Sequence, residues 1–140
     1  MKKKKKDVKI YKWSDKQKKE ARLLLEKYKN RLNLHGWQIC LYFKNGQVDE
    51  AVDATGSTYV TSGIVAVTSE YEKAKIVLKP SILEEIAENG NKDILANTIK
   101  HELAHCITQE ILDVAVSRYV TQKQCLDAVE RLTQRISVLI

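Results

Sequence analysis

Residues 94–108 read ILANTIKHELAHCIT, and this stretch gives the strongest indication of the fold. Its apolar side chains recur at the three- and four-residue spacing of an α-helix, which predicts a helix that buries one face. Within it, residues 101–105 spell H-E-x-x-H. Two histidines four residues apart lie on the same side of a helix, where both imidazoles can reach one zinc ion. The intervening glutamate projects about 100° away around the axis and can reach a water on that ion. The stretch therefore predicts His101 and His105 as metal ligands and Glu102 as a general base.

A chance occurrence of H-E-x-x-H on an ordinary amphipathic helix is the alternative, expected on the order of once in a few hundred chains of this length. The surroundings disfavour it, because both histidines belong to a helical stripe that borders the apolar face. The stripe consists of Ile94, Thr98, His101, His105 and Thr108. Its apolar neighbours are Leu95, Ile99, Leu103 and Cys106. We therefore expect each chain to bind one Zn2+ ion.

The composition suits one compact domain that does not enter a membrane. The chain has 140 residues, 44% of them hydrophobic, and contains no apolar run long enough to cross a bilayer. Its lysine-rich start is not followed by the apolar segment of a signal peptide, so we expect no export. Three widely spaced cysteines, Cys40, Cys106 and Cys125, fit reduced thiols in the core of a cytoplasmic protein.

Positive charge is concentrated at the N-terminus. Residues 1–31 hold 14 Lys/Arg and 4 Asp/Glu, a net charge of +10, whereas the remainder contributes −4 to the overall +6. The lysine run from Lys2 to Lys6 can attract nucleic acid or another polyanion through counterion release. A solvated tail with no partner is the alternative, and no recognised DNA-binding motif accompanies the run. We expect residues 1–12 to form a disordered basic arm with a weak nucleic-acid contact, and residues 13–140 to form a single domain.

Capping and turn signals divide the domain into a helix, a small sheet and further helices. A capping box that starts at Ser14 predicts a helix ending near residues 33–36, and a second box at Ser81 predicts a short helix. Longer helices are expected at 92–113 and 121–139. Segments rich in β-branched and aromatic residues predict strands at 37–43, 57–61, 64–68 and 74–78, with a loop at 47–56. The order predicts an α+β fold with a small, mostly antiparallel sheet and a metal site on the C-terminal helices.

A catalytic zinc site takes a third protein ligand and leaves one position for water. Glu130 is the best placed carboxylate, because it lies one position past Val129 at the border of the last helix's apolar stripe. The alternative for Glu130 is an ordinary boundary glutamate that is solvated or paired with a base. His35, in the turn before the first strand, is better explained by packing or capping. Glu110 and Asp113 follow the motif on the same helix but face away from it or lie too far along it.

Residues 94–105 resemble the active-site helix of the minimal zincin metallopeptidases, in particular the SprT-like proteins and the small phage and prophage relatives of the ImmA/IrrE peptidases. The resemblance covers roughly residues 37–132. It implies a minimal zincin-like fold with a strand just before the motif helix, as at residues 74–78. The chain departs from these families in three ways: it has no third motif histidine after His105, no cysteine zinc ribbon and no helix-turn-helix domain.

Carried over residue by residue, the resemblance implies that His101 and His105 bind zinc and that Glu102 is the base. Members that take a glutamate as third ligand place it in a V-E-x-φ setting, which residues 129–132 match. Glu130 is then the third zinc ligand.

The predicted activity is hydrolysis of a peptide bond in a protein substrate by a zinc metallopeptidase encoded by a phage or another mobile element, acting in the cytoplasm or a host's cytoplasm. The peptide is expected along an edge strand, either 64–68 or 74–78. Tyr119, between the last two helices, is a candidate to stabilise the oxyanion. One alternative is a zinc-binding module whose site is catalytically idle, against which Glu102 argues. Another is a nucleic-acid-associated protein that relies on its lysine arm.

Overall fold

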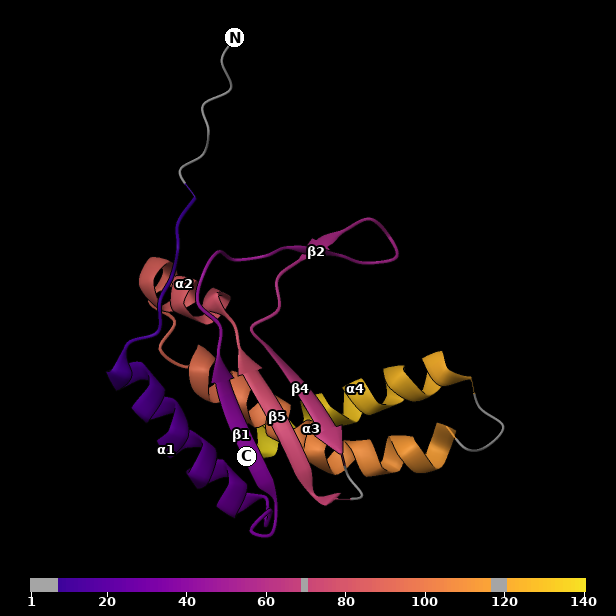
Figure 1. Ribbon diagram of the computed structural model, residues 1–140. Helices are drawn as coiled ribbons and strands as arrows, with labels where there is room; N and C mark the ends of the chain where they lie inside the picture. The colour runs from indigo at the N-terminus through magenta and orange to yellow at the C-terminus, as the bar shows by residue number, and fades with distance from the viewer. Residues whose placement is uncertain (1–7, 69–70, 117–120) are drawn as a thin grey trace.

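A computed structural model describes residues 8–68, 71–116 and 121–140 of the chain. An N-terminal helix precedes a small sheet, and helices follow it, which confirms the predicted α+β fold (Figure 1). The helices are α1 (Asp15–Arg31), α2 (Pro80–Asn89), α3 (Ile94–Val116) and α4 (Gln122–Leu139). The strands are β1 (Gln38–Phe43), β2 (Ala51–Val52), β3 (Thr58–Tyr59), β4 (Gly63–Thr68) and β5 (Lys73–Leu78).

The strand β5 lies at the centre of a three-stranded sheet of order β1-β5-β4. It runs parallel to β1, with Ile76 opposite Leu41, and antiparallel to β4, with Ile76 opposite Val65. A separate antiparallel hairpin joins β2 to β3. Because β5 is paired on both sides, the expectation that residues 74–78 could be a free edge is wrong. The other candidate edge, residues 64–68, lies in β4 at the border of the sheet.

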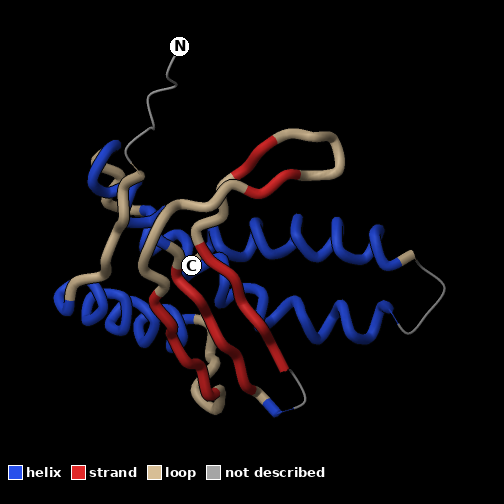
Figure 2. Tube along the Cα trace, turned by 45° about the horizontal axis from the view of Figure 1, so that its top comes forward, coloured by secondary structure: helices blue, strands red, loops and turns tan. Residues whose placement is uncertain are grey.

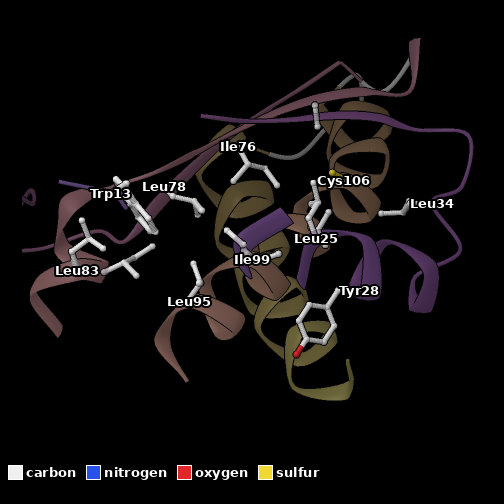
Figure 3. Close-up of a cluster of buried hydrophobic side chains, with 14 residues drawn as sticks. Trp13, Leu25, Tyr28, Leu34, Ile76, Leu78, Leu83, Leu95, Ile99 and Cys106 are labelled. Atoms are coloured by element: carbon white, nitrogen blue, oxygen red, sulfur yellow. The ribbon is translucent and has the colours of Figure 1, made fainter. Parts of the chain in front are cut away.

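Side chains from α1, the sheet and α3 form the main hydrophobic core. Figure 3 shows Leu25 and Tyr28 of α1, Ile76 of β5 and Ile99 of α3 among these buried groups. The N-terminal half of α3 packs against α1 and the sheet. Its C-terminal half runs alongside α4 in a two-helix arm that extends past the strands (Figure 2). A smaller apolar cluster of Leu112, Cys125 and Val129 lies between these two helices.

The predicted capping box holds the start of α1. The Gln17 backbone N–H donates to Ser14 Oγ over 3.1 Å, and the Ser14 N–H donates to Gln17 Oε1 over 3.0 Å. The helix ends at Arg31 with Leu32 as its C-cap residue, and Asn33 follows in the left-handed region with φ of 57°. The start and the stop signal at residues 33–36 are therefore both confirmed.

The second predicted capping box is wrong. The helix α2 begins at Pro80, and Lys79 is its N-cap residue. Proline suits the first helical position, because its fixed φ is already helical and its missing N–H would have no partner there. The Ser81 hydroxyl instead donates to the Thr61 carbonyl over 2.8 Å, which ties α2 to the segment before β4.

Two further local expectations need correction. The loop predicted at residues 47–56 contains β2, and the strand predicted at 57–61 is reduced to β3. Cys106 and Cys125 are buried as expected, but Cys40 is exposed. Cys40 alternates with the inward-facing residues of β1, so it points to the outer face of the sheet.

Ordered contacts begin before the predicted domain boundary at residue 13. Tyr11 forms a β-bridge with Gly46, and the Lys9 ammonium lies 2.7 Å from a carboxylate oxygen of Glu88. Trp13 itself is 3% exposed, and its ring lies 5.1 Å from that of Phe43. The segment just before α1 is thus part of the folded domain.

Trp13→Ala should lower the free energy of unfolding by about 3–5 kcal/mol, because it removes a large buried ring that the neighbouring side chains cannot replace. Urea denaturation followed by circular dichroism measures this change. Leu23→Ala on the outer side of α1, where Leu23 is 64% exposed, is the control and should change stability by about 0.5 kcal/mol or less. An equally small effect of both substitutions would contradict the place of Trp13 in the core.

Candidate metal centre

The two motif histidines lie one turn apart on α3, and their rings converge. The Nε2 atoms of His101 and His105 are 3.2 Å apart. The ring centroids are separated by 4.9 Å with an interplanar angle of 81°, so the rings meet edge to face. Each histidine side chain is about one-fifth exposed. Both nitrogens therefore point toward a common place that solvent can reach.

The helix α4 brings Glu130 to the same place. Its Oε1 lies 3.2 Å from His101 Nε2, and its Oε2 lies 3.5 Å from His105 Nε2. These three residues are the group of potential metal ligands found within the described part of the chain. Glu130 is more exposed than the histidines, so one side of the group is open. The position of Glu130 beside both histidines suits a metal ligand and also suits an ion pair with a protonated imidazole, so both interpretations made from the sequence fit it.

The spacing of these donor atoms tests whether a metal fits. Ligands at 2.0–2.1 Å in a tetrahedral site lie about 3.3–3.4 Å from one another. The two histidine Nε2 atoms, 3.2 Å apart, are close to that edge length, and each lies near a different oxygen of Glu130, at 3.2 and 3.5 Å. With one donor atom taken from each residue, the three atoms lie within 4.8 Å of one another. Two imidazole nitrogens and a carboxylate are a donor set for transition ions such as zinc, whereas calcium and magnesium prefer oxygen ligands. His101, His105 and Glu130 can thus hold one metal ion.

Burial favours the neutral form of the His105 imidazole, which is the form that binds a metal ion. Desolvation lowers the pKa of His105, the positive form of His101 lowers it further, and the Glu130 carboxylate opposes the shift. A neutral imidazole has the free lone pair that a metal requires.

Glu102 lies beside the donor group without belonging to it. Its side chain is 7% exposed, and burial raises its pKa to about 7, with the negative charge of Glu130 adding to the shift and Lys79 opposing it. Together with His101 it lines a cavity of about 700 Å3 between the N-terminal half of α3, the C-terminal half of α4 and the start of β4. A carboxyl group with a pKa near neutrality can both accept and return a proton at pH 7.

The start of β4 passes directly over Glu102 at Gly63. A Cβ atom on this glycine would lie 2.9 Å from Thr98 Cγ2 and 3.3 Å from both Cγ and Oε1 of Glu102. The missing side chain is what lets the strand approach the carboxylate so closely. Gly63 was not anticipated from the sequence, since the need for a glycine arises only when β4 and α3 come together.

The other residues weighed from the sequence lie elsewhere. His35 is exposed in the turn between α1 and β1, and Asp113 lies further along α3; neither belongs to the donor group. Tyr119, the lysines from Lys2 to Lys6 and the side chain of Glu110 are outside the described part of the chain.

No family model, curated protein or solved structure matches this chain. Within the described residues, none of the helices has the length and apolar character that crossing a membrane requires.

Because the pKa of Glu102 is raised, we expect Glu102→Gln to change the free energy of unfolding of chelator-treated protein in a pH-dependent way. The folded state holds this proton more tightly than the unfolded state, whose value is 4.5, so stability declines as pH rises from about 4.5 to 7. The substitution removes the ionisation and should therefore stabilise the metal-free protein at pH 8 by as much as about 3 kcal/mol. The gain should shrink toward pH 5.

Urea denaturation of both proteins in EDTA at pH 5, 6, 7 and 8 measures the difference in unfolding free energy. A difference that stays constant over this range would contradict the buried, proton-binding state of Glu102.

Gly63→Ala should push β4 away from α3, because the new methyl group meets Thr98 Cγ2 first. We expect a loss of about 1–3 kcal/mol in unfolding free energy. The matched test is the double variant with Thr98→Ser, which removes Cγ2 but keeps the hydroxyl that donates to Ser62 Oγ over 2.9 Å. Thermal unfolding of the single and double variants should show partial recovery in the double variant. No recovery would mean that the close approach at Gly63 does not limit the packing.

Proposed function

We propose that this chain is a zinc-dependent metallopeptidase. The observation that carries the proposal is the convergence of His101, His105 and Glu130, with the buried carboxyl group of Glu102 next to them on the wall of a cavity. A structural zinc site needs four protein ligands and no neighbouring base. Three ligands, an open position and a neighbouring carboxyl group match the requirements of hydrolysis.

The proposed roles follow from the positions of the side chains. Zinc held there would polarise the scissile carbonyl and make a coordinated water more acidic. Glu102 takes the proton of the attacking water and passes it to the leaving amine. Its place on the wall of the cavity gives the base direct access to a substrate.

The free edge of β4 supports a peptide as the substrate. β4 pairs with β5 on one side, and no strand of the described chain pairs with the other. An extended peptide can add to such an edge through backbone hydrogen bonds, and Gly63 brings that edge to Glu102. The adjoining cavity is lined by polar, apolar and charged side chains and can take a substrate side chain; Asn97, Ile94 and Lys100 are examples of the three kinds. The three free cysteines support a reducing compartment such as the cytoplasm for this activity.

The experiment that tests the function separates metal binding from chemistry. Purified protein should contain about one equivalent of zinc, and His101→Ala, His105→Ala and Glu130→Ala should each lose it. Glu130→Gln should also bind poorly, because an uncharged amide donates less well to the ion. Asp127→Ala, on the exposed side of α4, is the control and should keep the metal. Metal analysis and zinc titration against a chelator measure these outcomes.

Glu102→Gln should keep zinc while hydrolysis of a quenched fluorescent peptide library falls by about 10²–10⁴-fold, because only the base is removed. Unchanged zinc content in Glu130→Ala would contradict the proposed ligand set. Equal hydrolysis by wild type and Glu102→Gln would contradict the catalytic role.

A further inference from the structure

Two buried threonines lie behind the metal-binding edge of His105. Thr108 of α3 and Thr133 of α4 are both fully buried, and their hydroxyl oxygens are 2.9 Å apart. Thr133 Oγ1 also lies 2.8 Å from the Val129 carbonyl oxygen and 3.3 Å from His105 Nδ1. A buried hydroxyl in such a network has one proton to donate and two lone pairs with which to accept.

Thr108 Oγ1 also lies 3.4 Å from the His105 carbonyl oxygen, which is the longest contact of the network. Counting donors and acceptors over the three shorter contacts, all made by Thr133, gives the direction of each bond. The Val129 carbonyl can only accept, so the single proton of Thr133 goes to it. Thr133 then accepts at its two lone pairs, from the Thr108 hydroxyl and from His105 Nδ1–H. The other tautomer of His105 would place a nitrogen lone pair against an oxygen lone pair, with no proton between them. The three short contacts are all hydrogen bonds only when His105 carries its proton on Nδ1.

We propose that Thr133, supported by Thr108, is a positioning residue that holds His105 as the Nδ1–H tautomer and keeps Nε2 free for the metal. The inference rests on the proposed metal site and assigns a role to a residue outside the ligand set. Thr133 lies three residues after Glu130, so both face His105 from one turn of α4. The helix α4 thereby contacts both ring nitrogens of His105: Glu130 lies at the metal-binding side and Thr133 at the opposite side.

The test uses protein labelled with 15N at histidine, first without metal in EDTA at pH 8. Long-range 1H–15N NMR distinguishes the two tautomers by their nitrogen shifts. Wild type and Thr133→Ser should show His105 as Nδ1–H, because serine keeps the hydroxyl. Thr133→Val, which has nearly the same shape without the donor and acceptor, should show a mixture of tautomers. His35 is the internal reference, because it is exposed in the turn between α1 and β1, whereas His101 contacts His105 directly through Nε2.

Zinc affinity provides the second readout. Thr133→Val should bind zinc about 10–100-fold more weakly than wild type, the usual cost of losing the partner of a ligating histidine. Thr133→Ser should restore most of the affinity, and Thr108→Val should have a smaller effect because its bond to His105 is indirect. Wild-type affinity in Thr133→Val would overturn the inference.

The tautomer of His105 in wild type tests the inference without requiring any variant to fold. An Nε2–H proton on His105 in metal-free wild type would overturn the inference. Failure of wild type to bind zinc would instead overturn the proposed function, and the tautomer spectra would still decide the role of Thr133.

Discussion

The packing of α3 against α4 is the contact on which the metal centre depends. The H-E-x-x-H helix supplies two histidines, but the third donor, Glu130, and the hydrogen-bond partner of His105, Thr133, both come from α4. Within the described residues, the apolar cluster between the two helices consists of Leu112, Cys125 and Val129. The hydrogen-bonded pair Thr108–Thr133 adds a buried polar contact at the same junction.

One helix serves three different surroundings because successive residues of α3 point about 100° apart. Ile99 and Leu103 face the core formed with α1 and the sheet, and both are fully buried. The histidines face α4, and Glu102 faces the start of β4. The core therefore fixes the rotation of α3 about its axis, and that rotation sets where the ligands and the base point. A change in the packing around Ile99 that rotated α3 about its axis would therefore move the histidines and Glu102.

Features that depend on a few neighbouring residues, such as the start of a helix or the face that it buries, could be predicted from the sequence. The Ser14 capping box and the helical stripe through His101 are of this kind, and both correspond to the structure. Periodicity placed Glu130 at the border of an apolar stripe, and the resemblance to known metallopeptidases then singled it out as the third ligand.

Features that depend on contacts between distant segments of the chain could not be predicted from the sequence. The parallel pairing of β1 with β5, which puts β5 in the centre, requires the chain to cross over between them. The role of Gly63 arises only from the approach of β4 to α3, and that of Thr133 only from the packing of α4. A threonine within an apolar stripe has no signature that separates a structural hydroxyl from one that contacts a ligand.

Charge links the metal centre to the base. In the metal-free site the negative charge of Glu130 and the burial of Glu102 both raise the pKa of Glu102, to about 7. A dication held by His101, His105 and Glu130 would bring the largest charge in the site and would oppose both causes. Glu102 would then be ionised when the ion is bound and largely protonated below pH 7 when it is not. The base would thus reach its active form together with the ion, while without the ion the site avoids two negative carboxylates close to each other.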